Sequence, residues 1–416
     1  MSTAAAWISG ALFLFFLIRA CPGWVRCFTG KETNELNLPE TARFERREYG
    51  RVLLILAGSL ILRIALVCAV RLLSGRNTRL EDTFYLYSGL DTRHYLDIAR
   101  DGYTSAENLG ENLNLVFLPG YPLLAGMLMM LLPNEALCGY LAAWLPFLGG
   151  GLALYRLLRL DGGPEKATRQ LAIFCLFPAA VFFAYPMSES LFLMASAGSL
   201  YAARTRRWFA AGVFGFWAAF TRSPGVLTAV PLGVELICQQ RGQWRKPQTL
   251  KNLLKHGACL LMVPAGTAVY LYINFTVTGD PLIFLQYQQS NWHQHLSWFF
   301  QTAATQTEYA IRTWTEDSVK FWGLWMPNLI TGFISLIWMG RAAKKLRPSY
   351  TAWFAVYFAV CYGSSWLLSG PRYMTVFFPL AVAADELRVP KWLLYLLLTA
   401  ASIGYTLCFA MRWGVW

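Results

Sequence analysis

Long apolar stretches recur along the whole chain, and short basic segments separate them. Roughly a dozen of these stretches approach the ~20 residues that an α-helix needs to cross a bilayer. Of the 416 residues, 56% are hydrophobic and only 14% are charged, whereas about a quarter of the residues in a soluble domain are charged. We therefore expect an all-α polytopic membrane protein, in which residues 1–416 form one domain of about 12 transmembrane helices.

The net charge of +13 arises mainly from lysine and arginine residues between the apolar stretches. Such clusters mark the cytoplasmic loops of membrane proteins, and we prefer this interpretation to nucleic-acid binding, for which a basic chain is otherwise a candidate. The segments expected inside are 19–51, 156–169, 204–207, 241–255 and 341–347. The loops 74–136 and 276–320 are then expected to be extracytoplasmic.

Helices threaded between these basic segments give a consistent path. The expected outward spans are 52–73, 168–184, 207–221, 256–275, 349–368 and 391–411. The expected inward spans are 137–156, 187–203, 224–238, 321–340 and 371–387. The helix over 121–132 is short and begins beside two prolines, so it is re-entrant or interfacial, or else it crosses and the inside assignment of the Arg156 loop is wrong. The run Trp7–Ile18 lacks a basic flank and a clear cleavage site, which favours a retained helix over a signal peptide.

The nine cysteines are scattered, mostly in apolar stretches, and none belongs to a Cys-x-x-Cys pair. We interpret them as small hydrophobic residues. Among the four histidines, His293 and His295 alternate and do not match the helical spacing of metal ligands. No Asp-x-Asp sequence occurs, so we expect neither a metal site nor a nucleotide-sugar donor that needs a chelated cation.

Polar and ionisable residues gather in the stretch 84–122. Asp91 begins a short amphipathic helical pattern, and Gly102 stands where such a helix would end. A helix of this kind lies at the lipid–water interface and would hold Asp91 at the mouth of the bundle. Asp91 is a candidate general base, although aspartate is also a favoured helix N-cap. The N-cap role alone does not account for the neighbouring His94 and Tyr95.

Further charged residues, far apart in the sequence, map to the same outer face. Arg372 lies at a helix N-terminus, where a cation opposes the dipole, so it requires an anionic partner, either a structural carboxylate or a ligand phosphate. Arg222 follows an apolar helix, where it suits either the dipole of that helix or a phosphate. Glu189 follows Pro186 at a helix start and is either a first-turn acidic residue or a catalytic one.

The outer loop 276–320 adds Asp280 and several aromatic residues, including Trp292. Tryptophans are common at membrane interfaces, and aromatic rings also form the walls of sugar and isoprenoid sites. Ionisable residues that collect at one face of a membrane protein are candidates for a functional site.

Five short motifs follow one another along residues 84–380. They are Leu90-Asp91 with His94–Tyr103, Phe117–Pro122, Phe177-Pro178 with Ser188–Phe192, Ala219–Gly225, and Arg372-Tyr373. In type and order they resemble the motifs of the GPI mannosyltransferase 2 (PIG-V-like) family, including its prokaryotic branch. The sequence departs from the family pattern at Leu90, where tryptophan is expected, at Gly120, and at Met187-Ser188. These departures bear on the acceptor and the sugar.

The resemblance implies a fold of the glycosyltransferase C (GT-C) superfamily, with an interfacial helix in the first large extracytoplasmic loop. It also implies an inverting mannosyltransferase that uses polyprenyl- or dolichyl-phosphate mannose, a glycan or glycolipid acceptor, and no cofactor. The active site would face outward from a bacterial plasma (inner) membrane, or into the lumen from the ER membrane of a eukaryote.

In this scheme Asp91 is the catalytic base that takes the proton from the acceptor hydroxyl. Arg372, and in second place Arg222, balances the charge of the leaving phosphate, while Glu189 orients the acceptor. The other expected substrate contacts are His94, Tyr95, Tyr121, Asp280, Trp292 and Tyr373.

Three alternatives stay open at this point. A transporter or flippase of a lipid-linked substrate would need inner-face polar residues and a midplane site, whereas the ionisable residues here collect at one face. A GT-C enzyme with another polyprenyl-phosphate sugar differs only in its donor. A non-catalytic subunit of a glycosyltransferase would retain the fold, and the presence of Asp91 argues against it.

Overall fold

The computed structural model describes residues 1–29, 46–75, 91–104, 112–240 and 246–415. Across these residues the regular secondary structure is helical, with one isolated β-bridge between Leu296 and Ser364. Leu90, the polar segment 105–111 and part of the basic segments 19–51 and 241–255 lie outside the described residues.

The N-terminal part of the chain forms three long helices and four short elements. These are α1 (Ser2–Thr29), α2 (Arg46–Leu73), α4 (Asp91–Asp101), η2 (Gly102–Thr104), η3 (Leu113–Val116), α5 (Gly120–Met129) and α6 (Glu135–Arg159). In α4, Thr92, Tyr95 and Ile98 recur at helical spacing and are buried, which fixes one face of the helix against the bundle. Gly102, with φ of 72°, follows the end of α4, as the sequence predicts.

The middle of the chain is interrupted by prolines and forms short helices. These are α7 (Pro164–Cys175), η4 (Pro178–Ala184), α8 (Glu189–Arg204), α9 (Trp208–Thr221), η5 (Ser223–Thr228) and α10 (Ala229–Gln240). Proline lacks the N–H that a continuous helix requires, and the chain bends by 86° between α7 and η4, where Pro178 stands.

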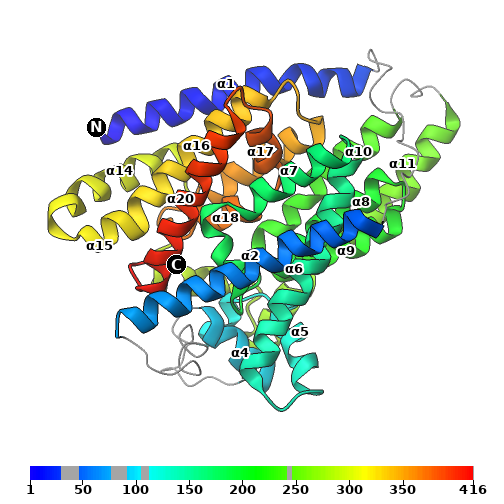
Figure 1. Ribbon diagram of the computed structural model, residues 1–416. Coiled ribbons are helices and arrows are strands. Elements are labelled where there is room, and N and C mark those ends of the chain that lie inside the picture. Colours follow the sequence, from blue (N-terminus) through cyan, green and yellow to red (C-terminus); the bar gives the residue numbers. More distant parts are fainter. Residues whose placement is uncertain (30–45, 76–90, 105–111, 241–245, 416) are drawn as a thin grey trace.

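The C-terminal part is again helical throughout. Its elements are α11 (Pro247–Leu260), α12 (Met262–Thr278), α13 (Ile283–Trp292), α14 (Phe299–Glu316), α15 (Ser318–Lys320), the π-helical turn η6 (Phe321–Trp325), α16 (Met326–Ala342), α17 (Pro348–Cys361), α18 (Gly370–Val376), α19 (Pro379–Asp385) and α20 (Lys391–Ala410). Figure 1 shows α1 along one edge of the bundle beside α14 and α16, and α4 with α5 together at one end.

Six helical segments of the described chain are long and apolar enough to cross a membrane, or seven if the bent pair α7–η4 counts as one span. They are α1, α2, α6, α11 with α12, α15 to α16, and α20. The chain is therefore an integral membrane protein, but the expectation of about 12 spans is not confirmed. At 1.5 Å per residue, α8, α9 and α17 extend only about 21–24 Å.

The region 121–132 becomes the ten-residue helix α5, about 15 Å long. This length is too short for a hydrocarbon core of about 30 Å. The structure thus disfavours the alternative in which this helix crosses. A re-entrant or interfacial position stays a prediction.

The core of the bundle is aromatic. Trp353 of α17 contacts Phe377 and Phe378, with ring centroids 4.8 and 5.6 Å away, and all three side chains are fully buried. Such rings bury a large apolar area and interlock edge to face. This layer separates the two ends of the bundle.

The ends carry different groups of charged residues, and α8 connects them. Glu189 is the first residue of α8 and Arg204 the last, about 23 Å apart along the helix axis. We call the end that carries Asp91, Glu189, Arg222 and Arg372 the Asp91 end. We call the opposite end, which carries Asp161, Arg204, Glu235 and Arg347, the basic end.

The interpretation of all cysteines as small hydrophobic residues is wrong for two of them. Cys27 of α1 and Cys238 of α10 form a disulfide, with their Cα atoms 5.1 Å apart. These residues are 211 positions apart in the sequence, so spacing gave no sign that they meet. The disulfide ties α1 to α10 at the basic end.

Candidate active site

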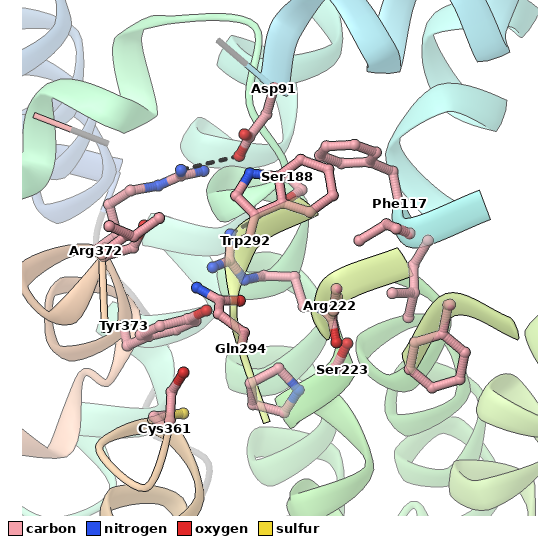
Figure 2. Close-up of a pocket in the computed structure, with 18 of the residues that line it drawn as sticks. Asp91, Phe117, Ser188, Arg222, Ser223, Trp292, Gln294, Cys361, Arg372 and Tyr373 are labelled. Atoms are coloured by element: carbon pink, nitrogen blue, oxygen red, sulfur yellow. Dashed lines mark hydrogen bonds and ion pairs between the residues drawn. The ribbon is translucent and has the colours of Figure 1, made fainter. Parts of the chain in front are cut away.

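A cavity of about 370 Å³ opens at the Asp91 end. Residues from α4, the η3–α5 connection, α9–η5, α13, α17 and α18 form its wall. The lining residues with polar or aromatic side chains are Asp91, Tyr95, Phe117, Ser188, Thr221, Arg222, Ser223, Phe284, Gln288, Trp292, Gln294, His295, Cys361, Ser364, Ser369, Arg372 and Tyr373. Figure 2 shows Asp91 and Arg372 facing one another at this cavity, with Trp292, Gln294 and Arg222 beside them.

Two carboxylates and two guanidinium groups form a continuous network at the cavity. Arg372 Nη1 donates to Asp91 Oδ2 at 2.9 Å. Its Nε and Nη2 both donate to Glu189 Oε1, at 2.8 and 2.7 Å. Arg222 Nη1 donates to the same Oε1 at 2.5 Å. One buried carboxylate oxygen therefore holds both arginines.

Local structure explains how four distant residues reach one place. Asp91 and Glu189 are the first residues of α4 and α8, where carboxylates suit the helix dipole. Arg222 is an extended residue between α9 and η5, and Arg372 lies in the first turn of α18 behind Pro371.

Glu189 lies beneath the cavity wall and does not line the cavity. Its side chain is 1% exposed, and among the described residues its Oε2 has no hydrogen-bond partner. An unpaired buried carboxylate oxygen is costly, so this carboxylate is not optimised for stability. The geometry assigns Glu189 to holding Arg222 and Arg372, and it does not place this carboxylate where it would orient an acceptor.

The two arginines differ in the donors that remain available. All three side-chain nitrogens of Arg372 donate to carboxylates, and its guanidinium lies 4.4 Å from the centroid of the Phe182 ring. Arg222 uses only Nη1, toward Ser188 at 3.0 Å and toward Glu189. Within the described part of the chain, Nε and Nη2 of Arg222 have no hydrogen-bond partner. Of the five N–H donors of each guanidinium, Arg222 therefore keeps three unused, whereas Arg372, whose Nη2 also donates to Met187 Sδ at 3.7 Å, keeps one.

Arg222 keeps its positive charge. Burial alone would lower the pKa of its guanidinium, but the Glu189 carboxylate outweighs burial and holds this pKa above its usual value. A fixed positive charge with unused N–H donors is suited to a phosphate.

Aromatic residues complete the wall next to Asp91. The Tyr95 hydroxyl is 3.0 Å from Ser188 Oγ, and the Tyr95 ring contacts Phe117 and Tyr121, with centroids 5.4 and 5.1 Å away. Burial, reinforced by the Asp91 carboxylate, raises the pKa of Tyr95 well above its usual range. Tyr95 therefore stays neutral and serves as a hydrogen-bonding group.

Six of the ten residues expected at the site line the cavity, and four do not. Those that line it are Asp91, Tyr95, Arg222, Trp292, Arg372 and Tyr373. His94 stacks behind Phe117 at 4.5 Å and contacts Asn114, while Tyr121 donates to the carbonyl of Gly139 at 2.6 Å. Asp280 accepts from the backbone N–H of Leu282 at 2.8 Å, in the turn that precedes α13. Glu189, the fourth, lies beneath the wall.

Sequence reasoning predicted Trp292 but missed the other residues that α13 contributes, because it assigned no helix within the loop 276–320. Phe284, Leu285, Gln288 and Trp292 line the cavity, and they are spaced as one face of a helix. That spacing is visible in the sequence. Phe117 and Ser188 were noted only as parts of motifs.

Gly120, one of the departures from the family pattern, has a steric reason here. A Cβ at this position would lie 2.5 Å from Thr221 Oγ1 and 2.9 Å from Thr221 Cα. Only glycine lets the start of α5 approach the Thr221-Arg222 turn so closely. The change therefore adjusts the packing behind Arg222.

Among the described residues, no group of three or more histidine, cysteine, aspartate or glutamate side chains is arranged to hold a metal ion. The carboxylates at the cavity are instead paired with arginines. A reaction without metal or cofactor stays a prediction.

Comparison with curated proteins finds a match to the "GPI alpha-1,6-mannosyltransferase 2" of Cricetulus griseus, 31% identical over 204 residues. The match covers 45% of this chain and only 40% of that protein. No family model and no solved structure matches. The match supports a distant relationship to a mannosyltransferase, in the direction that the motifs indicate, and it leaves the prokaryotic branch and the GT-C fold as predictions.

Proposed function

We propose that this protein is an inverting membrane glycosyltransferase of the GT-C type, which moves mannose from a polyprenyl- or dolichyl-phosphate donor to a hydroxyl of a glycan or glycolipid. The main support is the arrangement at the cavity, where one carboxylate borders the open space and a second, buried carboxylate holds two arginines. The distant mannosyltransferase relative supports the same reaction class. The site faces the extracytoplasmic side in this proposal.

Asp91 acts as the general base. Its side chain is 31% exposed, and Arg372 holds only Oδ2, which leaves Oδ1 for the acceptor hydroxyl. Asp91 takes the hydroxyl proton as the acceptor oxygen attacks the anomeric carbon. The bond from that carbon to the phosphate oxygen breaks with inversion, and its electron pair stays on the phosphate.

Arg222 binds the donor phosphate in this scheme, and Arg372 is a positioning residue. Nε and Nη2 of Arg222 contact the phosphate, whose charge increases as the bond breaks, so this interaction strengthens in the transition state. Arg372 keeps Asp91 at a fixed place beside the reacting atoms. This reverses the order of importance expected from sequence, because Arg222 keeps more unused N–H donors than Arg372 does.

The remaining wall suits the other parts of the substrates. Trp292 and Phe117 offer ring faces and edges to the sugar, and Gln288 and Gln294 offer amide groups to its hydroxyls. The polyprenyl chain follows an apolar rim of cavity residues whose side chains are exposed, namely Leu285, Leu296 and Val360.

A transporter or flippase would need a route between the two ends of the bundle. The fully buried rings of Trp353, Phe377 and Phe378 pack against one another, and Trp353 lies on α17 between the two cavities. The close packing of cores opposes the opening of a route beside them. The transferase is therefore the better-supported function.

The proposal is tested with the purified full-length chain in lipid nanodiscs, a panel of glycosyl donors and a short-chain glycolipid acceptor. We expect transfer from a polyprenyl-phosphate mannose, no transfer from a nucleotide-linked mannose, and a product with inverted anomeric configuration. Retained configuration, or transfer from the nucleotide donor alone, would contradict the proposal.

A further inference from the structure

A second cavity, of about 630 Å³, lies at the basic end. Helix ends and turns from α1, α6–α7, α10, α16–α17 and α19 surround it. Its charged and polar lining residues are Arg26, Asp161, Lys166, Gln170, Lys344, Lys345, Arg347, Tyr350, Thr351 and Glu386. Its volume is within the range of about 300–1,000 Å³ that is typical of ligand sites.

Positive charge exceeds negative charge in this wall, with five basic side chains against two carboxylates. Each carboxylate is already shared between two bases. Glu386 contacts Lys166 at 2.7 Å and Lys345 at 3.1 Å. Asp161 contacts Arg347 at 3.5 Å and Arg204, which lies outside the lining, at 2.8 Å. Among the described residues, the wall of this cavity therefore carries more basic than acidic side chains.

The basic groups also differ in how firmly they are held. Glu235 fixes Arg347 through Nε and Nη2, at 3.1 and 3.0 Å. Lys344 is exposed at the cavity and has no ion-pair or hydrogen-bond partner in the described part of the chain. The cavity is therefore lined by one arginine in a fixed position, Arg347, and by one lysine, Lys344, whose ammonium group is available to a ligand. Such a cavity concentrates positive potential and attracts anions.

We propose that the cavity at the basic end binds a phosphate group, carried either by an anionic lipid headgroup or by a free phosphate compound. Lysine and arginine side chains give charge-assisted hydrogen bonds to phosphate oxygens, and the lining supplies both kinds. This site is independent of the proposed transfer reaction. It lies at the other end of α17, whose 14 residues extend about 20 Å, beyond the Trp353 ring layer.

The test measures binding to delipidated, detergent-purified full-length protein by thermal shift. The probes are dihexanoyl phosphatidic acid, dihexanoyl phosphatidylcholine as the lipid control, and inorganic phosphate. We expect saturable stabilisation by phosphatidic acid and not by phosphatidylcholine. Equal stabilisation by inorganic phosphate assigns the site to free phosphate compounds, and weaker stabilisation assigns it to lipid headgroups.

Two variants separate this cavity from general surface charge. Lys344→Gln combined with Lys345→Gln should weaken phosphatidic acid binding roughly 30-fold, since each basic group near an anionic headgroup contributes a factor of about five. Glu386 keeps Lys166 as a partner in that variant, so its carboxylate is not left unpaired. The matched control is Lys251→Gln with Lys255→Gln on α11, where both lysines are exposed outside the cavity.

Equal loss of binding in the control variant would overturn the proposal. So would equal stabilisation by phosphatidic acid and phosphatidylcholine, or the absence of any saturable response to the phosphate probes.

Discussion

Each end of the bundle buries a glutamate against arginine, but the two networks are completed differently. At the basic end, Glu235 Oε1 accepts from Arg347 and from Ser349, the latter at 2.6 Å, and Oε2 accepts from Arg347. At the Asp91 end, Glu189 Oε1 accepts from two arginines, while its Oε2 has no partner in the described part of the chain.

The difference indicates which network is structural. Asp161, beside Glu235, accepts from Arg204, Arg347 and Tyr350, so it joins the ends of α6, α8 and α17. A fully satisfied polar network rigidifies a structure. At the Asp91 end, by contrast, donors of Arg222 and an oxygen of Asp91 are left over beside a cavity. Unused hydrogen-bonding capacity, more than charge itself, distinguishes the Asp91 network from the network of Glu235 and Asp161, which joins helices beside the second cavity.

The largest expected effect compares one aspartate from each network. Asp91→Asn should reduce kcat by about a thousandfold, because the amide keeps the shape of the side chain but cannot accept the proton. Asp161→Asn should leave kcat nearly unchanged and destabilise the fold by up to about 3 kcal/mol, because buried arginines lose a charged partner. Steady-state kinetics and thermal unfolding of both variants measure this.

A loss of kcat in Asp161→Asn as large as that in Asp91→Asn would end the distinction between the two networks. Unchanged turnover by folded Asp91→Asn would remove the base assignment.

The second prediction separates the two arginines of the Asp91 end. Arg222→Gln should lower kcat/KM by an amount equivalent to about 2–4 kcal/mol of transition-state stabilisation. It should also raise the KM for the donor, because it removes the group that contacts the phosphate. Arg372→Lys should lower kcat with little change in donor KM, because a lysine keeps the charge but cannot hold Asp91 and Glu189 together. The measurement is the split between kcat and donor KM. The opposite split would return the phosphate to Arg372.

The third prediction asks which side of the membrane each end occupies. In a variant without the exposed Cys21, a cysteine at Ser290 on α13 should react with a membrane-impermeant reagent added outside, and a cysteine at Lys344 should not, because basic segments stay inside. Labelling of intact cells followed by mass spectrometry measures both. The disulfide Cys27–Cys238 lies at the basic end, and disulfides are rare in the cytosol of most organisms. It therefore argues against the inside position that the basic segments predict for this end, and the labelling decides between the two. Labelling only at Lys344 would invert the topology.

Much of the site was visible in the sequence, because its residues carry unusual chemistry for an apolar chain. Asp91 and Arg372 are charged residues beside apolar segments, which marks them as functional candidates. The sequence also predicts an anionic partner for Arg372, and in the structure the carboxylates of Glu189 and Asp91 fill that role. Which of the two arginines keeps more free donors was not predictable. It depends on how α8, α9 and α18 converge, and no spacing in the sequence encodes that.

The fold was predictable as a class and less so in detail. Hydropathy finds the six long segments. A membrane helix satisfies its backbone hydrogen bonds within one segment, so each span appears in the sequence as one continuous apolar stretch. The expected spans 187–203, 207–221 and 349–368 fall on α8, α9 and α17, but these helices have only 16, 14 and 14 residues, so they are not confirmed as spans. The Cys27–Cys238 pairing was beyond reach, since only tertiary packing brings α1 and α10 together.

The smallest expected effect compares two tyrosines, each of which is hydrogen-bonded to one network. The Tyr95 hydroxyl meets Ser188 at 3.0 Å beside Arg222, and the Tyr350 hydroxyl donates to Asp161 at 3.1 Å. A single hydrogen bond contributes about 1 kcal/mol. Tyr95→Phe should therefore lower kcat by about fivefold, because Ser188 and Arg222 lose part of their alignment, while Tyr350→Phe should lower stability by about 1 kcal/mol without changing kcat.

Because the raised pKa keeps Tyr95 neutral, its removal should not alter the pH–rate profile below about pH 9. Kinetics across pH and thermal unfolding on both variants decide the matter. If the two substitutions reduce kcat equally, the networks are coupled through α8 and the two ends of the molecule are not functionally separate.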